Sequence, residues 1–198
     1  MNGIVFLDRD GTLIEDTGYL RDPLGVRILP GVAEGLRMLS AKGYILAVLS
    51  NQSGLARGKF TRDEMEAVHM AFLEKFKKER VVFDAVEYCP HYPLGVVEEY
   101  RKECSCRKPG AGLAEIVLCR LKILDACRRW MVGDKLSDIE LGIRLKARTV
   151  LVETGYGASE LKEVERLGIV PETVLPGMLE AAQWILSEDN NSPKVKSP

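Results

Sequence analysis

The amino-acid sequence predicts an α/β fold built around a doubly wound parallel sheet. Short apolar runs alternate with longer segments of helical periodicity, as in βαβ units. Most of these runs are continuously apolar, which is typical of strands that helices bury on both faces. With 198 residues, of which 46% are hydrophobic, the chain has the length of one domain and enough apolar side chains for a sizeable core. We therefore expect a single domain over residues 1–187.

The expected strands are the apolar runs 4–7, 44–50, 85–88, 129–132 and 149–152. Thr61 and Glu64 form a capping box before a helix that extends to about residue 80. Ser137 and Glu140 form a second capping box. Other helices are expected over about 30–42, from 109 to about 124, and after residues 159 and 176.

The charges of the chain nearly cancel. There are 28 Lys and Arg against 29 Asp and Glu, a formal net charge of -1, so composition does not point to nucleic acid or to an anionic membrane. No run approaches the roughly 18 apolar residues of a membrane span, and the first residues lack the architecture of a signal peptide. We expect a cytoplasmic monomer that acts on a small molecule, with no nucleic-acid or membrane partner. Residues 188–198 are polar, contain two prolines and are expected to be a disordered tail.

The first candidate site is the segment Asp8-Arg9-Asp10-Gly11-Thr12, directly after the first strand. Ligands of open α/β sheets bind beyond the carboxyl ends of the strands, so two carboxylates at this point are placed to act on a substrate. Their mutual repulsion favours a divalent cation. Because Asp and Gly are also common in turns, an acidic turn that closes the strand remains an alternative.

A second candidate, Ser50-Asn51-Gln52-Ser53-Gly54, follows the second strand. Its hydroxyl and amide groups suit the oxygens of a phosphoryl group, although an ordinary turn is an alternative. The next residues, 54–60, do not form a Walker A loop, because three residues separate the glycines and no Ser or Thr follows the lysine.

Two further segments carry charge near predicted helix starts. Arg107 and Lys108 precede a helix, where a solvated surface pair is the alternative. Asp134, in Gly133-Asp134-Lys135, follows a strand, and Ser137 already caps the next helix, so Asp134 is free for another role.

A Cys-x-His pair and a Cys-x-Cys pair lie in a long irregular loop, 89–106. Three thiols and one imidazole match a tetrahedral structural zinc site, and such a loop needs something other than a core to organise it. The four predicted ligands are Cys89, His91, Cys104 and Cys106. Coincidental clustering is the alternative. Cys119 and Cys127 are expected to be small buried residues.

These motifs occur in the order found in phosphatases of the haloacid dehalogenase superfamily. Over about residues 3–157 the sequence resembles, within that superfamily, the D-glycero-D-manno-heptose 1,7-bisphosphate phosphatases. The residues that carry this narrower resemblance are the run 8–14, Gly18-Tyr19, Asn51-Gln52-Ser53-Gly54, Ala56-Arg57-Gly58, Cys89-Pro90-His91 and Cys106-Arg107-Lys108-Pro109. Histidinol phosphatase domains share the Asp-x-Asp and zinc-loop motifs but differ over 52–58. Ser50 stands where the heptose family commonly has Thr, and it keeps the hydroxyl.

The resemblance implies a role for each residue of these motifs. Asp8 would be the nucleophile that forms an aspartyl-phosphate, and Asp10 the general acid and base. Ser50 and Lys108 would stabilise the phosphoryl charge. Asp8, the main-chain carbonyl of Asp10, and Asp134 would hold Mg²⁺.

The sequence leaves no room for a separate cap domain, so substrate selectivity is expected to lie in loops. The residues predicted to bind substrate are Arg9, Asp16, Thr17, Gly18, Tyr19, Asn51, Gln52, Ser53, Arg107 and Lys135. The resemblance implies removal of the 7-phosphate of the heptose bisphosphate, in nucleotide-activated heptose biosynthesis for cell-surface lipopolysaccharide. Histidinol phosphate hydrolysis is the enzymatic alternative. A non-catalytic zinc-stabilised binding module is another, although it has no need for four intact catalytic residues.

Overall fold

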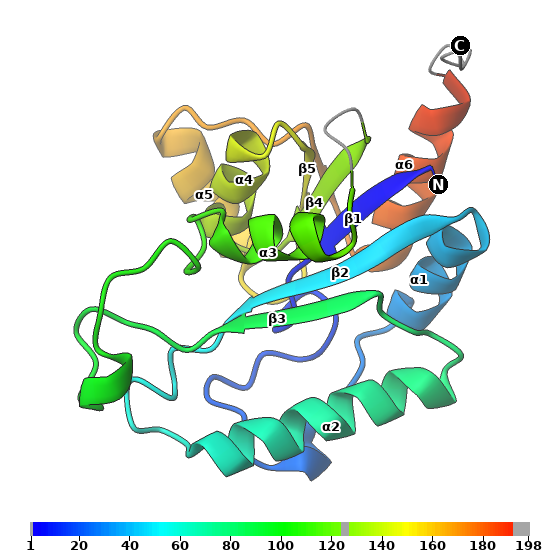
Figure 1. Cartoon of the computed structure of the whole chain (residues 1–198). Helices are drawn as coiled ribbons and strands as arrows, with labels where there is room; N and C mark the ends of the chain where they lie inside the picture. Colours follow the sequence, from blue (N-terminus) through cyan, green and yellow to red (C-terminus); the bar gives the residue numbers. More distant parts are fainter. Residues whose placement is uncertain (1, 124–126, 192–198) are drawn as a thin grey trace.

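A six-stranded parallel sheet forms the centre of the computed structural model, which describes residues 2–123 and 127–191. The strand order is β3-β2-β1-β4-β5-β6, so successive strands are added on one side of β1 as far as β3 and on its other side from β4 onward (Figure 1). The strands are β1 (Gly3–Leu7), β2 (Tyr44–Asn51), β3 (Ala85–Cys89), β4 (Arg129–Gly133), β5 (Arg148–Val152) and β6 (Thr173–Leu175). The predicted doubly wound fold and its five strands are confirmed, and β6 is an addition.

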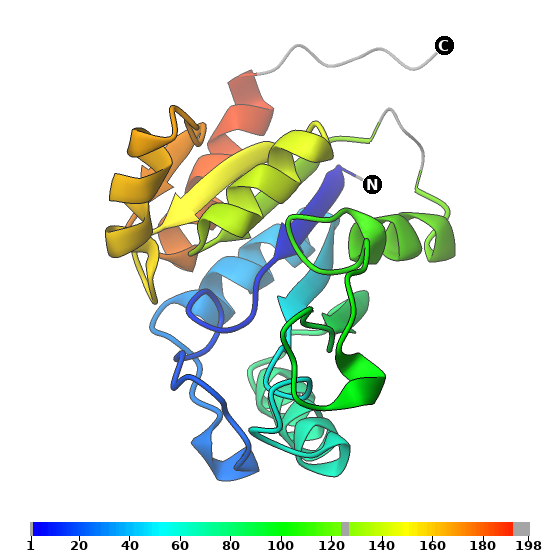
Figure 2. The ribbon, with the colours of Figure 1, turned by 90° about the vertical axis from the view of Figure 1, so that its left-hand side faces the viewer.

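Helices cover both faces of the sheet (Figures 1 and 2). They are α1 (Val32–Ala41), α2 (Arg62–Lys78), α3 (Gly112–Arg120), α4 (Leu136–Arg144), α5 (Gly157–Arg166) and α6 (Met178–Asn191). In β1, Val5 and Leu7 pack in the cluster with α1, α2 and α6, whereas Ile4 and Phe6 pack in the cluster with α3 and α4. This explains why the strand is apolar at every position.

Three helix boundaries differ from the sequence expectation. Helix α4 begins before Ser137, because Asp138 accepts the Lys135 main-chain N–H at 3.1 Å; the predicted Ser137 cap is wrong. Helix α3 ends at Arg120, and residue 124 lies outside the described residues. Helix α6 continues through the first residues of the expected tail, where Glu188 accepts a hydrogen bond from Arg148 at 2.6 Å. Residues 192–198 are outside the described part of the chain.

The segments that connect the described strands contain no further domain that covers the strand ends. Among the described residues, β1 and β2 are joined by a loop with a short 3₁₀ helix (Pro23–Gly25) and α1, and β2 and β3 by a loop and α2. The long loop after β3, green in Figure 2, contains only a second 3₁₀ helix (Glu98–Tyr100) before α3. The expectation of no separate cap domain is confirmed for this part of the chain.

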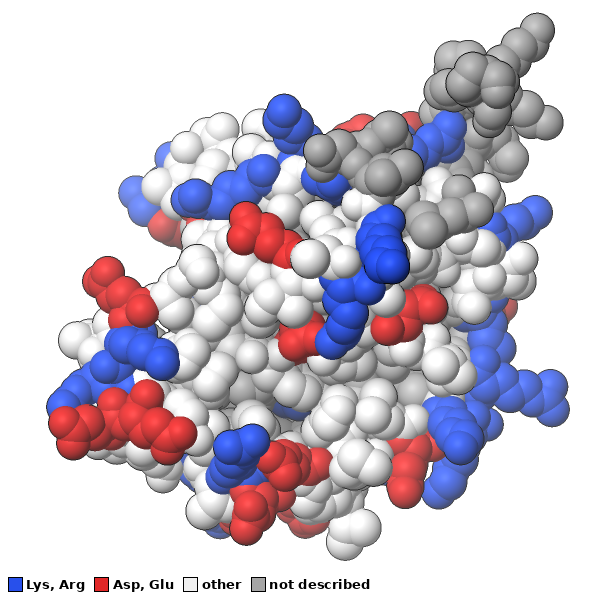
Figure 3. Space-filling view, in the orientation of Figure 1, with Lys and Arg blue, Asp and Glu red and all other residues white. Residues whose placement is uncertain are grey.

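The surface agrees with the nearly balanced charge. On the face drawn in Figure 3, acidic and basic side chains are interspersed among uncharged ones. No described helix has the combination of length and apolar character that crossing a membrane requires.

Candidate active site

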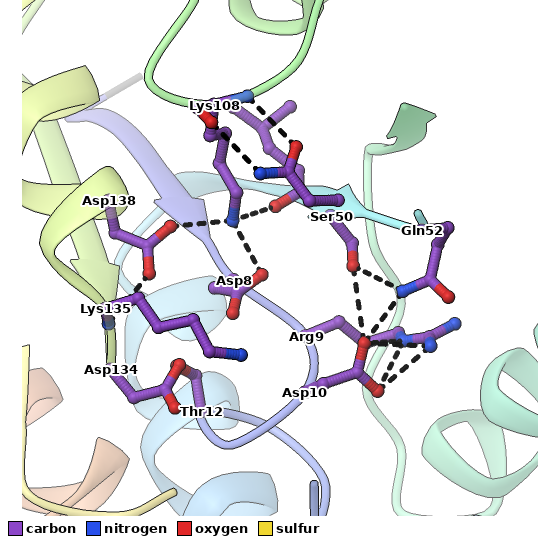
Figure 4. A network of polar contacts seen from close by, with 12 residues as sticks. Asp8, Arg9, Asp10, Thr12, Ser50, Gln52, Lys108, Asp134, Lys135 and Asp138 are labelled. Carbon is purple, nitrogen blue, oxygen red and sulfur yellow. Dashed lines mark hydrogen bonds and ion pairs between the residues drawn. The ribbon is translucent and has the colours of Figure 1, made fainter. Parts of the chain in front are cut away.

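The predicted catalytic residues meet at the carboxyl ends of three neighbouring strands (Figure 4). Asp8 follows β1, Ser50 lies near the end of β2, and Asp134 follows β4. Lys108 reaches the same point from the segment before α3, and its side chain is buried. The parallel topology therefore joins segments that are up to about 125 residues apart in the chain.

Lys108 is the centre of the buried polar network. Its Nζ lies 2.6 Å from Asp8 Oδ1 and 2.7 Å from Asp138 Oδ1, and it donates a hydrogen bond to the Leu49 carbonyl at 2.7 Å. Burial alone would lower the pKa of Lys108, but Asp138 and Asp8 raise it above its ordinary value. The ammonium group therefore stays charged, with Asp8 and the Leu49 carbonyl as hydrogen-bond acceptors and Asp138 as a second ion-pair partner.

The site holds more negative charge than Lys108 alone balances. Carboxylate oxygens of Asp8, Asp134 and Asp138 lie within 4.8 Å of one another. Burial, and then the charge of Asp8, raise the pKa of Asp134 to about 8, and burial raises that of Asp138 to about 6. Buried carboxylates with raised pKa values suit a bound divalent cation, and Mg²⁺ prefers such oxygen ligands. The donors present therefore fit the predicted magnesium site.

The main chain around Asp134 is packed too closely for a side chain. Gly11 has a φ of +88°, and a Cβ there would lie 2.1 Å from Asp134 Oδ2; a Cβ on Gly155 would lie 2.3 Å from the same atom. The Tyr156 N–H donates to Asp134 Oδ2 at 2.9 Å. The glycine of the Asp-x-Asp-Gly motif is thus required both by its backbone conformation and by its contact with a carboxylate.

The Asp10 carboxylate is held by three side chains beside this cluster. Arg9 donates to it through Nε at 3.1 Å and through Nη2 at 2.9 Å, Gln52 Nε2 donates at 2.8 Å, and the Ser50 hydroxyl lies 3.5 Å away. Arg9 is only 1% exposed, so it is not available as a substrate contact on the surface of the site.

Two cavities lie at the strand ends. The smaller one, about 30 Å³, is lined by Asp8, Asp10, Ser50, Asn51, Lys108, Lys135 and Ser137. The other, about 290 Å³, is lined by Asp10, Asp16, Gly18, Tyr19, Asn51, Gln52, Ser53, Gly54, Phe60, Lys135 and Tyr156. A larger cavity of about 440 Å³ is lined by residues that include Arg21, Phe60 and Tyr100. Its lining contains neither the buried carboxylates nor Lys108. The cavities of about 30 Å³ and about 290 Å³ are therefore the candidate places for the reaction.

Seven of the ten predicted substrate residues line the 290 Å³ cavity, whereas Arg9, Thr17 and Arg107 do not. Thr17 is exposed. Arg107 lies over the Tyr92 ring at 5.3 Å and donates to the His91 carbonyl at 3.4 Å.

Asn51 does more than line the cavities. Its Oδ1 accepts from the Lys108 N–H at 3.0 Å and its Nδ2 donates to the Lys108 carbonyl at 3.1 Å. The side-chain amide thus fixes the main chain from which the Lys108 side chain extends.

Sequence reasoning missed Asp138 and Tyr156. Asp138 stands four residues after Asp134, at the third position of α4, where a side chain caps the helix and points back toward the strand end. The four-residue spacing from Asp134 could therefore have indicated Asp138 from the sequence. Tyr156 follows β5 without a comparable signal, and its ring lies 4.8 Å from Lys135 Nζ across the cavity.

The four predicted zinc ligands also come together. Cys106 Sγ lies 3.1 Å from Cys89 Sγ, 3.2 Å from Cys104 Sγ and 3.2 Å from His91 Nδ1, and Cys89 Sγ lies 3.6 Å from Cys104 Sγ. Ligands about 2.3 Å from a shared zinc ion would be about 3.7 Å apart at tetrahedral angles. The thiols are not in disulfides. This donor set fits a metal centre. Cys119, which was expected to be buried, is exposed.

The sheet and its strand-end carboxylates define a haloacid dehalogenase-like hydrolase, and a family model described as HAD-hydrolase-like matches residues 105–181. The chain is 36% identical to the D-glycero-beta-D-manno-heptose-1,7-bisphosphate 7-phosphatase of Escherichia coli (strain K12), over 96% of this chain and 92% of the relative. It is 41% identical to the enzyme of the same name from Haemophilus ducreyi, over 76% and 83%. The chain belongs to this phosphatase family.

Solved structures agree with this assignment. The D,D-heptose 1,7-bisphosphate phosphatase from B. bronchiseptica, complexed with magnesium and phosphate, superposes with a TM-score of 0.81 at 29% identity. The alignment covers 94% of this chain and 99% of that one. A HAD-like phosphatase from Mesorhizobium loti gives a TM-score of 0.73 at 30% identity, over 92% and 87%.

Proposed function

We propose that this chain is an Mg²⁺-dependent phosphatase that removes the 7-phosphate of D-glycero-D-manno-heptose 1,7-bisphosphate, in nucleotide-activated heptose biosynthesis. Its membership of the phosphatase family supports this substrate. The observation that carries the proposal is the buried pair of Asp8 and Lys108, which lines the cavity of about 30 Å³; this cavity shares Asp10, Asn51 and Lys135 with the cavity of about 290 Å³. A carboxylate beside a fixed cation is what phosphoryl transfer to a carboxylate needs.

Asp8 is the proposed nucleophile. Burial would raise its pKa, but the charges of Lys108 and then Lys135 lower it below its ordinary value, so the carboxylate is ionised at neutral pH. One of its oxygens attacks phosphorus while the bond between phosphorus and the sugar oxygen breaks. The Asp10 carboxyl gives its proton to the leaving oxygen, and then takes a proton from the water that attacks the aspartyl-phosphate and releases phosphate.

Ser50 and Lys108 are the proposed donors to the phosphoryl oxygens. Both line the 30 Å³ cavity with Asp8, and both are almost fully buried. Donors fixed in a dry site stabilise charge that develops during transfer without reorganising.

Asp8, Asp134 and the Asp10 carbonyl are the proposed Mg²⁺ ligands. When bound, the ion neutralises negative charge on the phosphoryl oxygens. The clustered carboxylates and the raised pKa of Asp134 support a cation at this position.

We further propose that the Cys89, His91, Cys104 and Cys106 cluster binds structural zinc. These four side chains would fill all four positions of a tetrahedral zinc ion and would leave none for a reacting water. Cys106 is two residues from Lys108, so the metal fixes the loop where the catalytic segment begins.

A turnover comparison tests the substrate. We expect kcat/KM for the heptose bisphosphate to exceed that for histidinol phosphate, because family membership favours the heptose enzyme. A clear preference for histidinol phosphate would reverse the assignment, and failure to hydrolyse any phosphate ester would leave a binding module. The monomeric state and the cytoplasmic location remain predictions from sequence.

The same assay separates the two metals. Mild EDTA treatment should abolish turnover by removing Mg²⁺, which few protein ligands hold, and added Mg²⁺ should restore it. Zinc content should stay unchanged. If zinc has to be resupplied, the thiolate site is labile or takes part in the reaction.

A further inference from the structure

Arg9 is one of the largest fully buried side chains in the described part of the protein. Burying a guanidinium is costly unless hydrogen bonds and an opposite charge compensate for the lost water. Here the compensation comes from Asp10, whose two oxygens face Nε at 3.1 Å and Nη2 at 2.9 Å. Such a two-point contact fixes the plane of the carboxylate as well as its distance.

The other side of Arg9 faces Tyr88, at the end of β3. The guanidinium carbon lies 5.4 Å from the centre of the Tyr88 ring. The Tyr88 hydroxyl lies 2.6 Å from Nδ1 of His69 on α2, and the two rings meet edge to face with centres 5.0 Å apart. A chain of contacts thus runs from α2 through the end of β3 to the Asp10 carboxylate.

The charges along this chain are compatible with its geometry. Burial, and then Arg9, lower the pKa of His69, although Glu66 opposes this. The ring is therefore neutral near pH 7, and a neutral ring protonated on Nε2 accepts the Tyr88 hydroxyl proton at Nδ1.

The remaining contacts of Asp10 show what the chain fixes. Gln52 Nε2 donates to Asp10 Oδ2 at 2.8 Å and also to Ser50 Oγ at 2.8 Å, so this donor ties Asp10 to the predicted phosphate-binding hydroxyl. Asp10 lines both cavities, whereas Arg9 lines neither. The Arg9 side chain therefore has no direct contact with a ligand in either cavity, and its hydrogen bonds to Asp10 connect it to both.

We propose that Arg9 is a positioning residue that aims the Asp10 carboxylate at the leaving oxygen, and that Tyr88 and His69 hold Arg9 in place. The inference rests on the proposed role of Asp10 as the acid for the leaving group. It replaces the expectation from sequence that Arg9 binds substrate.

The test is Arg9→Lys, which keeps the charge and removes the two-point contact. With phenyl phosphate, whose leaving group needs the proton, we expect kcat/KM, which reports formation of the aspartyl-phosphate, to fall about 10- to 100-fold, because a misaimed acid affects the transition state of that step. With 4-nitrophenyl phosphate, a better leaving group, the loss should be less than about threefold. In an Asp10→Asn background Arg9→Lys should add nothing, because it acts through Asp10.

The matched control is Arg148→Lys. Arg148 is the first residue of β5, does not line the cavities at the strand ends, and pairs with two carboxylates, Glu172 and Glu188. This variant should leave the ratio of the two aryl phosphate rates unchanged. Circular dichroism and thermal melting of each variant report whether it folds.

A second variant serves if Arg9→Lys does not fold. Tyr88→Phe leaves Arg9 and Asp10 intact and removes the hydroxyl that contacts His69; Tyr100→Phe is its control. We expect a loss of about three- to tenfold with phenyl phosphate and a smaller one with 4-nitrophenyl phosphate.

Equal losses on both aryl phosphates, no loss, or additive losses in the Asp10→Asn background would each overturn the proposal. Turnover of the heptose bisphosphate by the wild type is a separate measurement. It decides the natural substrate, whereas the aryl series decides the role of Arg9 with any phosphate ester that the wild type hydrolyses.

Discussion

The strand-end cluster and the Cys/His loop are held together in opposite ways. Asp8 and Lys108 are each 4% exposed. Asp8 follows a strand whose apolar residues pack on both sides, and Lys108 is held by polar contacts with Asp8, Asp138 and the Leu49 carbonyl. In the loop, Leu94 is 79% exposed and Val96 is 73% exposed. Main-chain hydrogen bonds such as that from Tyr92 to Tyr100 and the four clustered Cys and His side chains link the loop internally.

This difference separates two ways of losing activity. A change within the strand-end cluster removes a reacting group from a scaffold that remains folded. If the loop binds the proposed zinc, a change among its Cys and His side chains removes the constraint itself, because metal affinity then contributes to folding free energy. The two perturbations should therefore differ in stability, metal content and substrate dependence.

The largest effect should come from Asp8→Asn. We expect turnover to fall by at least about 10³-fold, because an amide cannot serve as the nucleophile. Lys108 keeps its contacts with Asp138 and Leu49, so substrate binding and the melting temperature should change little. Single-turnover kinetics and thermal melting check this. Activity above about a tenth of the wild type would remove Asp8 from the role.

An intermediate effect is expected from Cys104→Ser, with the exposed Cys119→Ser as its control. The first variant should lose zinc and melt about 5–10 °C lower, because a loop without a core loses its organiser. Its KM for the bisphosphate should rise, and activity on a small phosphate ester should fall less. If the ratio of kcat/KM for the bisphosphate to kcat/KM for the small ester stays unchanged in a protein shown to lack zinc, the metal stabilises the loop without orienting its residues toward the substrate.

The smallest effect is a pH dependence of stability in the protein without bound Mg²⁺. Burial and Asp8 raise the pKa of Asp134 to about 8 from an unfolded value of 3.8. Between these values the folded state keeps a proton that the unfolded chain has released, so stability is lost as pH rises through this range. In EDTA, the melting temperature should fall from about pH 5 to about pH 8. Asp134→Asn should flatten the curve, and an unchanged slope in that variant would contradict the assignment.

The sequence predicted best the residues that stand directly after buried strands. Asp8 and Asp134 are located by the end of a continuously apolar run, and parallel topology then brings such ends to one edge. The clustering of Cys89, His91, Cys104 and Cys106 was predictable for a different reason, since two short spacings confine the donors locally.

Side-chain direction could not be predicted in the same way. Arg9 lies between two site carboxylates in the chain but turns inward to pair with Asp10, and Asn51 turns toward the Lys108 main chain. These directions depend on partners 57 residues away or on burial by other elements, which no local pattern encodes. Strand β6 was missed because only three half-buried residues form it.

The fully partnered ammonium of Lys108 has a consequence for affinity. Asp8 and the Leu49 carbonyl accept hydrogen bonds from it, and Asp138 forms an ion pair with it, so an arriving phosphate oxygen must compete with partners already within 2.7 Å. Exchange of one partner for another yields little net attraction for a resting phosphate. In the proposed mechanism the attraction would grow when Asp8 gives up its charge in the new bond to phosphorus, because one of the two carboxylates that compete with the phosphoryl oxygens for the lysine is then lost. The same exchange in reverse would let inorganic phosphate leave, so we expect Lys108 to favour fast turnover over tight retention of the product.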